Sequence, residues 1–294
     1  MNRLKANVML LLAAFIWGTA FVAQSVGMDS IGPVSFNCVR MFIGSLTLIP
    51  VIYFRRFMEK RKSGKVEKID LKKHIIGGAA CGAFLFLASV SQQMGLVFTT
   101  PAKSGFITAL YVVLVPIVGL FFKKKVRWNM WVAVVLAAAG LYFLCIQGSF
   151  VLQLGDLLTL ICAFMYTFHV LTVDHFSPET DPVILSCLQF FFCSLFSFCL
   201  MFFIEEPSVL QIYNAAIPIL YTGVLSSGVA FTFQVCAQKH TSPTVASLLM
   251  CLESVFAVLA GMVILSQIPS PAEAFGCVLM FVAIVLGQIF PEKE

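Results

Sequence analysis

The sequence has few charged residues: Asp, Glu, Lys and Arg together make up only 11% of its 294 residues. Soluble domains typically carry about 25%, so this composition excludes an ordinary soluble domain. Apolar residues make up 60% of the chain. Because a helix that crosses a bilayer needs about 20 mostly apolar residues, the length allows roughly ten spans and little else. We therefore expect an all-α integral membrane protein.

Motifs of common enzymes and metal centres are also missing. The ten cysteines are scattered singly, with no C-x-x-C pair. No H-E-x-x-H, G-x-S-x-G or G-x-x-x-x-G-K-[ST] segment occurs. His169 and Asp174 have the spacing of an acyltransferase H-x4-D motif, but on one helix their side chains would point about 140° apart. We predict a protein that is not an enzyme and has no cofactor or metal.

Ten apolar stretches are separated by polar or turn-forming residues, and each predicts a membrane-spanning helix. The first stretch resembles a signal peptide, but nine similar stretches follow, so we interpret it as a span. The predicted spans are 8–27, 33–54, 75–96, 104–122, 128–146, 157–173, 182–204, 215–237, 245–265 and 272–290.

Basic residues lie almost entirely on one side of these spans. Seventeen of the nineteen Lys and Arg residues fall in termini or loops on the side of the amino terminus, nine of them in the segment 55–73. Basic residues accumulate in cytoplasmic loops, so both termini are predicted to be cytoplasmic. Only Arg40 and Lys103 lie inside or at the edge of a span. The net charge of +5 is therefore a topology signal and does not indicate a nucleic-acid partner.

The two halves of the chain resemble each other at an offset of 149 residues, which becomes 142 after the second span. Five spans in each half give the second half the opposite orientation in the membrane. We predict two inverted five-helix repeats, 1–148 and 149–294, which favours a transporter that opens a central site to each side in turn. The matched pairs include Trp17 with Tyr166, Gln92 with Gln234, and Tyr111 with Glu253.

Two motifs carry a family resemblance: A-F-I-W-G-T-A-F at 14–21, with Arg40 in the next span, and S-P-T-V-A-S-L-L at 242–249, followed by Glu253. With them the sequence resembles the EamA family of the drug/metabolite transporter superfamily, over both halves. The resemblance implies ten helices around a central cavity, and export or exchange of amino acids or related small polar metabolites. It also implies a bacterial plasma-membrane protein whose partners are a small-molecule substrate and the lipid bilayer, with proton coupling and oligomeric state open.

The sequence departs from the family pattern at two places. Family members often have proline directly after the glutamate that stands here as Glu253, and this chain has Ser254. A proline-induced break beside Glu253 is therefore not predicted. Ser266 and Gln267 replace a Gly-Glu pair after the ninth span, which removes a charge at the membrane edge.

Ionisable side chains within the membrane cost about 2.5–3.5 kcal/mol to insert, so each suggests a function or a buried partner. Glu253 can bind a cationic group, carry a proton, or be protonated and hydrogen-bonded to another helix. Arg40 can anchor a substrate carboxylate, reach the outer interface, or pair with Glu205 or Glu206. Lys103, at the outer edge of the fourth span, can attract anionic solutes or be an ordinary interface lysine.

Polar and aromatic residues at matched positions complete the candidate site. Gln92 and Gln234 can bind a polar zwitterion or hydrogen-bond neighbouring helices. Trp17 and Tyr166 can form aromatic walls of a cavity or simply pack. The predicted substrate-binding residues are Trp17, Gln92, Tyr111, Tyr166, Gln234 and Glu253.

Other membrane functions are less well supported. A channel would need a repeated filter segment or a ring of acidic residues, and the sequence has neither. A lipid flippase or a drug efflux carrier remains the alternative to a metabolite carrier, and a membrane acyltransferase is much less favoured. Gly78 and Gly82 form a G-x-x-x-G segment, which we interpret as a packing face within the molecule.

Overall fold

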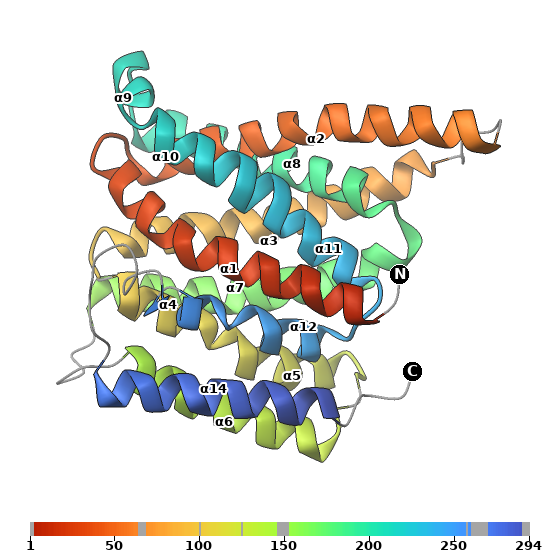
Figure 1. Cartoon of the computed structure of the whole chain (residues 1–294). Helices are drawn as coiled ribbons and strands as arrows, with labels where there is room; N and C mark the ends of the chain where they lie inside the picture. The colour runs from red at the N-terminus through yellow and green to blue at the C-terminus, as the bar shows by residue number, and fades with distance from the viewer. Residues whose placement is uncertain are drawn as a thin grey trace.

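The computed structural model describes residues 3–63, 69–99, 101–124, 126–145, 153–256, 258–259 and 270–289. Within these ranges the chain forms helices and short connections, without a strand. The helices run along a common direction, and the two chain termini lie at the same end of the bundle (Figure 1). We call this end the terminal end and the other the opposite end. The Ser266 and Gln267 departure lies outside the described residues.

The helices follow one another along the chain with short connections between them. Their bounds are α1 (Arg3–Met28), α2 (Pro33–Ser63), α3 (Leu71–Leu96), α4 (Pro101–Ala109), α5 (Tyr111–Phe121), α6 (Trp128–Cys145), α7 (Leu154–Phe176), η1 (Ser177–Glu179), α8 (Pro182–Ile204), α9 (Val209–Asn214), α10 (Ala216–Leu220), η2 (Tyr221–Phe231), α11 (Thr232–Gln238), α12 (Pro243–Met250) and α14 (Pro271–Ile289).

Seven helical segments of the described chain are long and apolar enough to cross a membrane. Three shorter apolar helices overlap the predicted spans 128–146, 245–265 and 272–290, and the last residue of each of these spans falls outside the described residues. The membrane character predicted from composition is confirmed, and the full set of ten spans stays a prediction. The seven segments are Arg3–Met28, Pro33–Arg61, Leu71–Leu96, Ser104–Phe121, Leu154–Glu179, Pro182–Ile204 and Ala216–Gln238.

Local sequence explains where several helices begin. Asp181 precedes Pro182 at the start of α8, and its carboxylate accepts hydrogen bonds from two backbone N–H groups of the first turn. Ser242 precedes Pro243 at the start of α12 and accepts a hydrogen bond from a backbone N–H in the same way. Proline has no N–H to leave unpaired and is pre-set for the first helical turn. The capping residue and the proline that follows it therefore fix where α8 and α12 begin.

Helices distant in sequence lie side by side. Helix α2 packs against α8, α6 against α14, α3 against both α7 and α8, and α1 against η2 and α11. Glycines allow the α3–α8 contact, because a Cβ at Gly82 would lie 2.7 Å from Cβ of Phe192, and one at Gly78 would lie 2.5 Å from Cβ of Leu188. The G-x-x-x-G segment therefore faces α8 within the molecule.

The fourth and ninth predicted spans are both interrupted, at matched positions. The backbone N–H of Leu110 bonds to the carbonyl of Ile107 at 3.2 Å, and that of Leu252 bonds to the carbonyl of Leu249 at 3.3 Å. Both are bonds to the third preceding residue, as in a 3₁₀ turn. The second break directly precedes Glu253. The helix is therefore interrupted beside Glu253 even though no proline follows, because a tightened turn breaks it.

Candidate functional site

A small cavity lies between helices of both halves of the chain. Its volume of about 40 Å³ has room for only a few water molecules, since one water needs at least about 10–15 Å³. All six residues predicted to bind substrate line it, together with Arg40. The full lining is Trp17, Phe21, Gln24, Arg40, Gln92, Thr108, Tyr111, Tyr166, Val170, Ser226, Phe231, Gln234, Met250 and Glu253.

The lining follows the repeat of the sequence. Applied to the cavity, the offsets of 149 and 142 residues relate most of its residues to one another in five pairs. Three of these pairs are those noted in the sequence, and two emerge only when the cavity is known. The pairs are Trp17 and Tyr166, Phe21 and Val170, Gln92 and Gln234, Thr108 and Met250, and Tyr111 and Glu253.

Arg40 is buried beside the cavity, with only 2% of its surface exposed. Its Nε donates to Oδ1 of Asn37 at 3.0 Å, and its Nη1 donates to Oε1 of Gln24 at 3.0 Å. Its Nη2 has no hydrogen-bond partner. Arg40 thus neither reaches the outer interface nor pairs with Glu205 or Glu206, because its partners are neutral side chains of α1 and α2.

Glu205 instead connects the end of α8 to the start of α2 at the opposite end of the bundle. Its Oε1 accepts from the backbone N–H of Val34 at 3.0 Å, and its Oε2 accepts from that of Ser35 at 2.8 Å. A Cβ at Gly32 would lie 2.4 Å from the Glu205 carboxylate, so the close approach requires glycine there. A residue at the end of α8 thereby caps the start of α2, where the partial positive charge of the helix favours a carboxylate.

Glu253 lies on the cavity wall with 5% of its surface exposed. Its Oε1 has no hydrogen-bond partner, which does not match a carboxyl held by a neighbouring helix. Tyr111, its counterpart in the first half, lines the same cavity, and its ring centroid is 6.5 Å from that of Tyr166. A free carboxylate oxygen among aromatic rings is suited to receive a cationic or hydrogen-bonding group.

The two matched glutamines are partly engaged by neighbours. Nε2 of Gln92 donates to the hydroxyl of Thr108 at 3.2 Å. Nε2 of Gln234 donates to Oε1 of Gln238 at 2.9 Å, and Gln238 in turn donates to the carbonyl of Val170 at 3.0 Å. Each of these two glutamines therefore lines the cavity and also forms a hydrogen bond to a neighbouring side chain.

Trp17 forms part of an aromatic wall. Its ring centroid is 4.7 Å from that of Phe231, and its Nε1 donates to the carbonyl of Ser226 at 3.3 Å. Ser226 and Phe231 belong to η2, an eleven-residue π-helix. Such helices are rare and often occur at functional sites. Sequence reasoning missed both residues because no local pattern marks a π-helix, whereas Gln24 was visible as a polar residue within an apolar span.

The other candidates lie elsewhere or outside the described side chains. The side chain of Lys103 lies outside them. His169 is buried, with Nε2 2.9 Å from Oε1 of Gln189, while Asp174 forms an ion pair with Lys124. His169 and Asp174 therefore have separate partners and form no dyad. In the described part of the chain, no group of three or more His, Cys, Asp or Glu residues could hold a metal ion.

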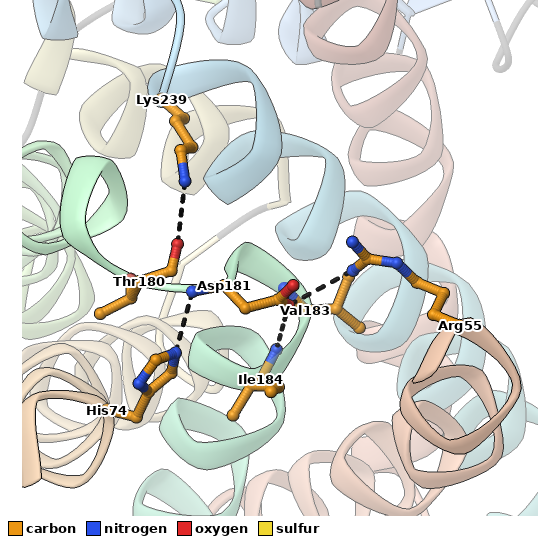
Figure 2. A network of polar contacts seen from close by, with 7 residues as sticks. All are labelled: Arg55, His74, Thr180, Asp181, Val183, Ile184 and Lys239. Carbon is orange, nitrogen blue, oxygen red and sulfur yellow. Dashed lines mark hydrogen bonds and ion pairs between the residues drawn. The ribbon is translucent and has the colours of Figure 1, made fainter. Parts of the chain in front are cut away.

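A polar network that the sequence did not predict connects four elements at the terminal end (Figure 2). Arg55 of α2 pairs with the Asp181 carboxylate at 3.3 Å. The backbone N–H of Asp181 donates to Nε2 of His74, on α3, at 2.9 Å. Nζ of Lys239, just after α11, donates to the carbonyl of Thr180 at 3.1 Å. These residues line a surface cleft of about 690 Å³.

The sequence model of the EamA-like transporter family matches residues 4–146 and again residues 153–287. The chain belongs to this family. It is 31% identical over 290 residues to an uncharacterized transporter of Archaeoglobus fulgidus, covering 98% of this chain and 87% of the relative. It is 22% identical over 297 residues to the uncharacterized transporter YwfM of Bacillus subtilis, covering 98% of this chain and 95% of that protein.

A solved crystal structure has the same fold, with a TM-score of 0.77 at 19% identity, covering 97% of this chain and 96% of the other. At this identity the likeness concerns the fold alone. Family membership and the apolar helices make this chain a multi-pass membrane transporter with a small-molecule substrate. The predicted family resemblance is confirmed, and the family is one of transporters rather than enzymes.

Proposed function

We propose that the protein is a secondary transporter that exports or exchanges amino acids or related small polar metabolites by alternating access. The five matched pairs of cavity residues carry this proposal. A site built from equivalent residues of two repeats lies on the axis that relates them. Exchanging the conformations of the repeats then exposes the same site first to one side and then to the other.

The proposed topology is ten spans in two inverted repeats, 1–148 and 149–294. Both termini lie at the same end of the bundle, as an even number of spans requires (Figure 1). The basic segment 55–73 connects α2 to α3 at this end. By the preference of basic residues for the cytoplasm, the terminal end is cytoplasmic in the bacterial plasma membrane.

The structure fits a closed state of such a transporter. The cavity of about 40 Å³ has room for only a few water molecules, so we expect its walls to separate when a larger solute enters. The Gln234–Gln238–Val170 hydrogen bonds connect the end of α11 to α7. Beyond them, the network around Asp181 links α2, α3, α8 and α11 (Figure 2). Entry from the cytoplasm requires these contacts to open.

The test is counterflow in liposomes that contain the purified protein. A mixed pool of labelled amino acids and related metabolites is offered outside, with the same pool unlabelled inside, with and without a pH gradient. Protein-dependent accumulation of at least one compound is expected, and protein-free liposomes are the control. Accumulation that depends on the gradient indicates proton coupling. Absence of flux for every compound contradicts the proposed substrate class and favours a lipid or drug substrate.

A further inference from the structure

We propose that Arg40 is the receptor for an anionic group of the transported solute, and that this group is a carboxylate. The inference rests on the proposed function, since it concerns the same cavity, but it adds the chemistry that selects the solute. It follows from the unused donors of Arg40, from the neutrality of its partners and from its burial.

The guanidinium group has donors to spare. An arginine carries five N–H groups. One at Nε and one at Nη1 are used by Asn37 and Gln24. The two N–H groups of Nη2 have no partner, although the atom is buried. Arginine N–H groups pair in parallel with the two oxygens of a carboxylate, and Arg40 lines the cavity in which such a group would lie.

The partners of Arg40 hold it in place without neutralising it. Oε1 of Gln24 also accepts from Nε2 of Gln93 at 2.8 Å, which ties α1 to α3. Asn37 donates from Nδ2 to the hydroxyl of Ser197 at 2.9 Å, which ties α2 to α8. All four of these partners and neighbours are uncharged. The side chain is therefore oriented by four helices, and its positive charge is left for another group.

Burial makes a counter-ion necessary. An ionised group removed from water without a partner is strongly disfavoured, and arginine does not lose its proton in proteins. Glu253 is the acidic residue that shares the cavity lining, yet it forms no ion pair with Arg40. The missing negative charge is supplied by the solute. A solute with an ammonium group as well would find the free carboxylate oxygen of Glu253 in the same cavity.

Among the residues that the structure describes, Arg40 has no charged counterpart in the second half of the chain. At the repeat offset of 149 residues, the counterpart of Arg40 is Gln189. Gln189 is buried, with its Oε1 2.9 Å from Nε2 of His169, and it is not part of the cavity lining. The cavity is therefore symmetric in its walls but not in its charge, and it orients a bound carboxylate toward the first half of the chain.

The first experiment uses the unmodified protein, purified in detergent. Its melting temperature is measured with each of the common amino acids, with simple mono- and dicarboxylates, with the carboxamide of every compound that stabilises it, and with inorganic phosphate. At least one carboxylate should stabilise the protein. Its carboxamide should require roughly 10- to 100-fold higher concentration, because a charge-assisted pair is lost.

The second experiment compares variants with those same probes. Arg40→Gln, which places the second-half residue in the first half, should bind carboxylate and carboxamide alike, and Arg40→Lys should restore part of the preference. Arg61→Gln is the matched control, since it removes an exposed arginine from the same helix, and it should keep the full preference.

Three results would overturn the proposal: equal affinity of the unmodified protein for carboxylates and carboxamides, stabilisation by phosphate alone, or no stabilisation by any carboxylate. Flux measurements in liposomes distinguish a failure of this proposal from a failure of the proposed function. Exchange of uncharged analogues as fast as of carboxylates would refute the anion site and leave the transporter intact. Arg40-dependent carboxylate binding without flux in liposomes would establish the site and refute the transport of these compounds.

Discussion

The centre of the molecule and its terminal end contain the same types of charged residue, but these are bonded differently. At the terminal end, one oxygen of Asp181 accepts from two backbone N–H groups and from Arg55, and its own N–H is bonded to His74. At the centre, Nη2 of Arg40 and Oε1 of Glu253 have no partner. The bonded groups hold the elements of the terminal end together, whereas the unbonded groups at the centre are the ones that the proposed site offers to a ligand.

This difference predicts opposite consequences of mutation. A residue whose hydrogen bonds are all internal contributes mainly to stability, so its loss should lower the melting temperature. A buried residue with an unused donor or acceptor contributes little to stability, so its loss should mainly affect binding and transport. Variants of Glu253, Asp181 and Lys73 test this contrast, and a variant of Gly82 shows for comparison the effect of disturbing a packing contact alone.

Glu253→Gln should reduce counterflow at least about tenfold, which corresponds to roughly 1.4 kcal/mol. The amide keeps the shape of the side chain but loses the charge that faces the cavity. The melting temperature should stay the same or rise, because an unpaired buried carboxylate is removed. Glu206→Gln, outside the cavity lining, is the control for the loss of one acidic residue. A fall in melting temperature with unchanged flux per folded molecule would assign Glu253 a structural role.

Gly82→Ala should destabilise the protein by about 1–3 kcal/mol, the usual cost of overfilling a close contact. The new Cβ would lie 2.8 Å from the backbone carbonyl of Gln189, which cannot easily move. The contact lies away from the cavity lining, so the apparent substrate affinity of the folded protein should not change. Gly105→Ala is the control, since its Cβ would meet no atom within 4 Å, and it should not lower the melting temperature.

Asp181→Ala should destabilise the protein by about 0.5–2 kcal/mol through loss of the cap of α8. Asp181→Asn keeps a capping oxygen but lacks the charge that pairs with Arg55, so most of the stability should remain. Thermal unfolding of the two variants in detergent separates the cap from the ion pair. If both lose the same amount, the pair with Arg55 and not the cap dominates.

Lys73→Ala should have no measurable effect on stability. Lys73 and Glu179 form an ion pair of 2.7 Å, but their side chains are 52% and 65% exposed, and exposed pairs contribute little. The same melting experiment as for Asp181 provides the measurement. A clear loss of stability would mean that the exposed rim of the terminal end holds it closed as firmly as the network around Asp181.

Much of the candidate site could be predicted from the sequence because its two halves resemble each other at fixed offsets. Trp17, Gln92 and Tyr111 were chosen for their counterparts in the second half, and all three line the cavity with those counterparts. The proposed pair of repeats explains the match, since equivalent residues of two repeats would occupy equivalent places around a shared axis. Gln24 has no polar counterpart, since the offset pairs it with Val173, and it was missed.

The breaks in the helices were less accessible to sequence reasoning. The missing proline after Glu253 counted only against a proline-induced break there, and sequence reasoning did not predict the tightened turn at Leu252 or the one at the equivalent Leu110. Backbone hydrogen bonds of this kind depend on packing against neighbouring helices, and no single residue type predicts them.

By itself the sequence determined the membrane environment, the helical class and the family. In a bilayer each span must satisfy its own backbone hydrogen bonds, so an apolar stretch of sufficient length has few choices other than a helix. Only the tertiary structure decided which polar groups are saturated. The partners of Arg40 come from α1 and α2, and the network around Asp181 includes residues more than a hundred positions apart. Such contacts depend on packing between distant segments, which no local pattern records.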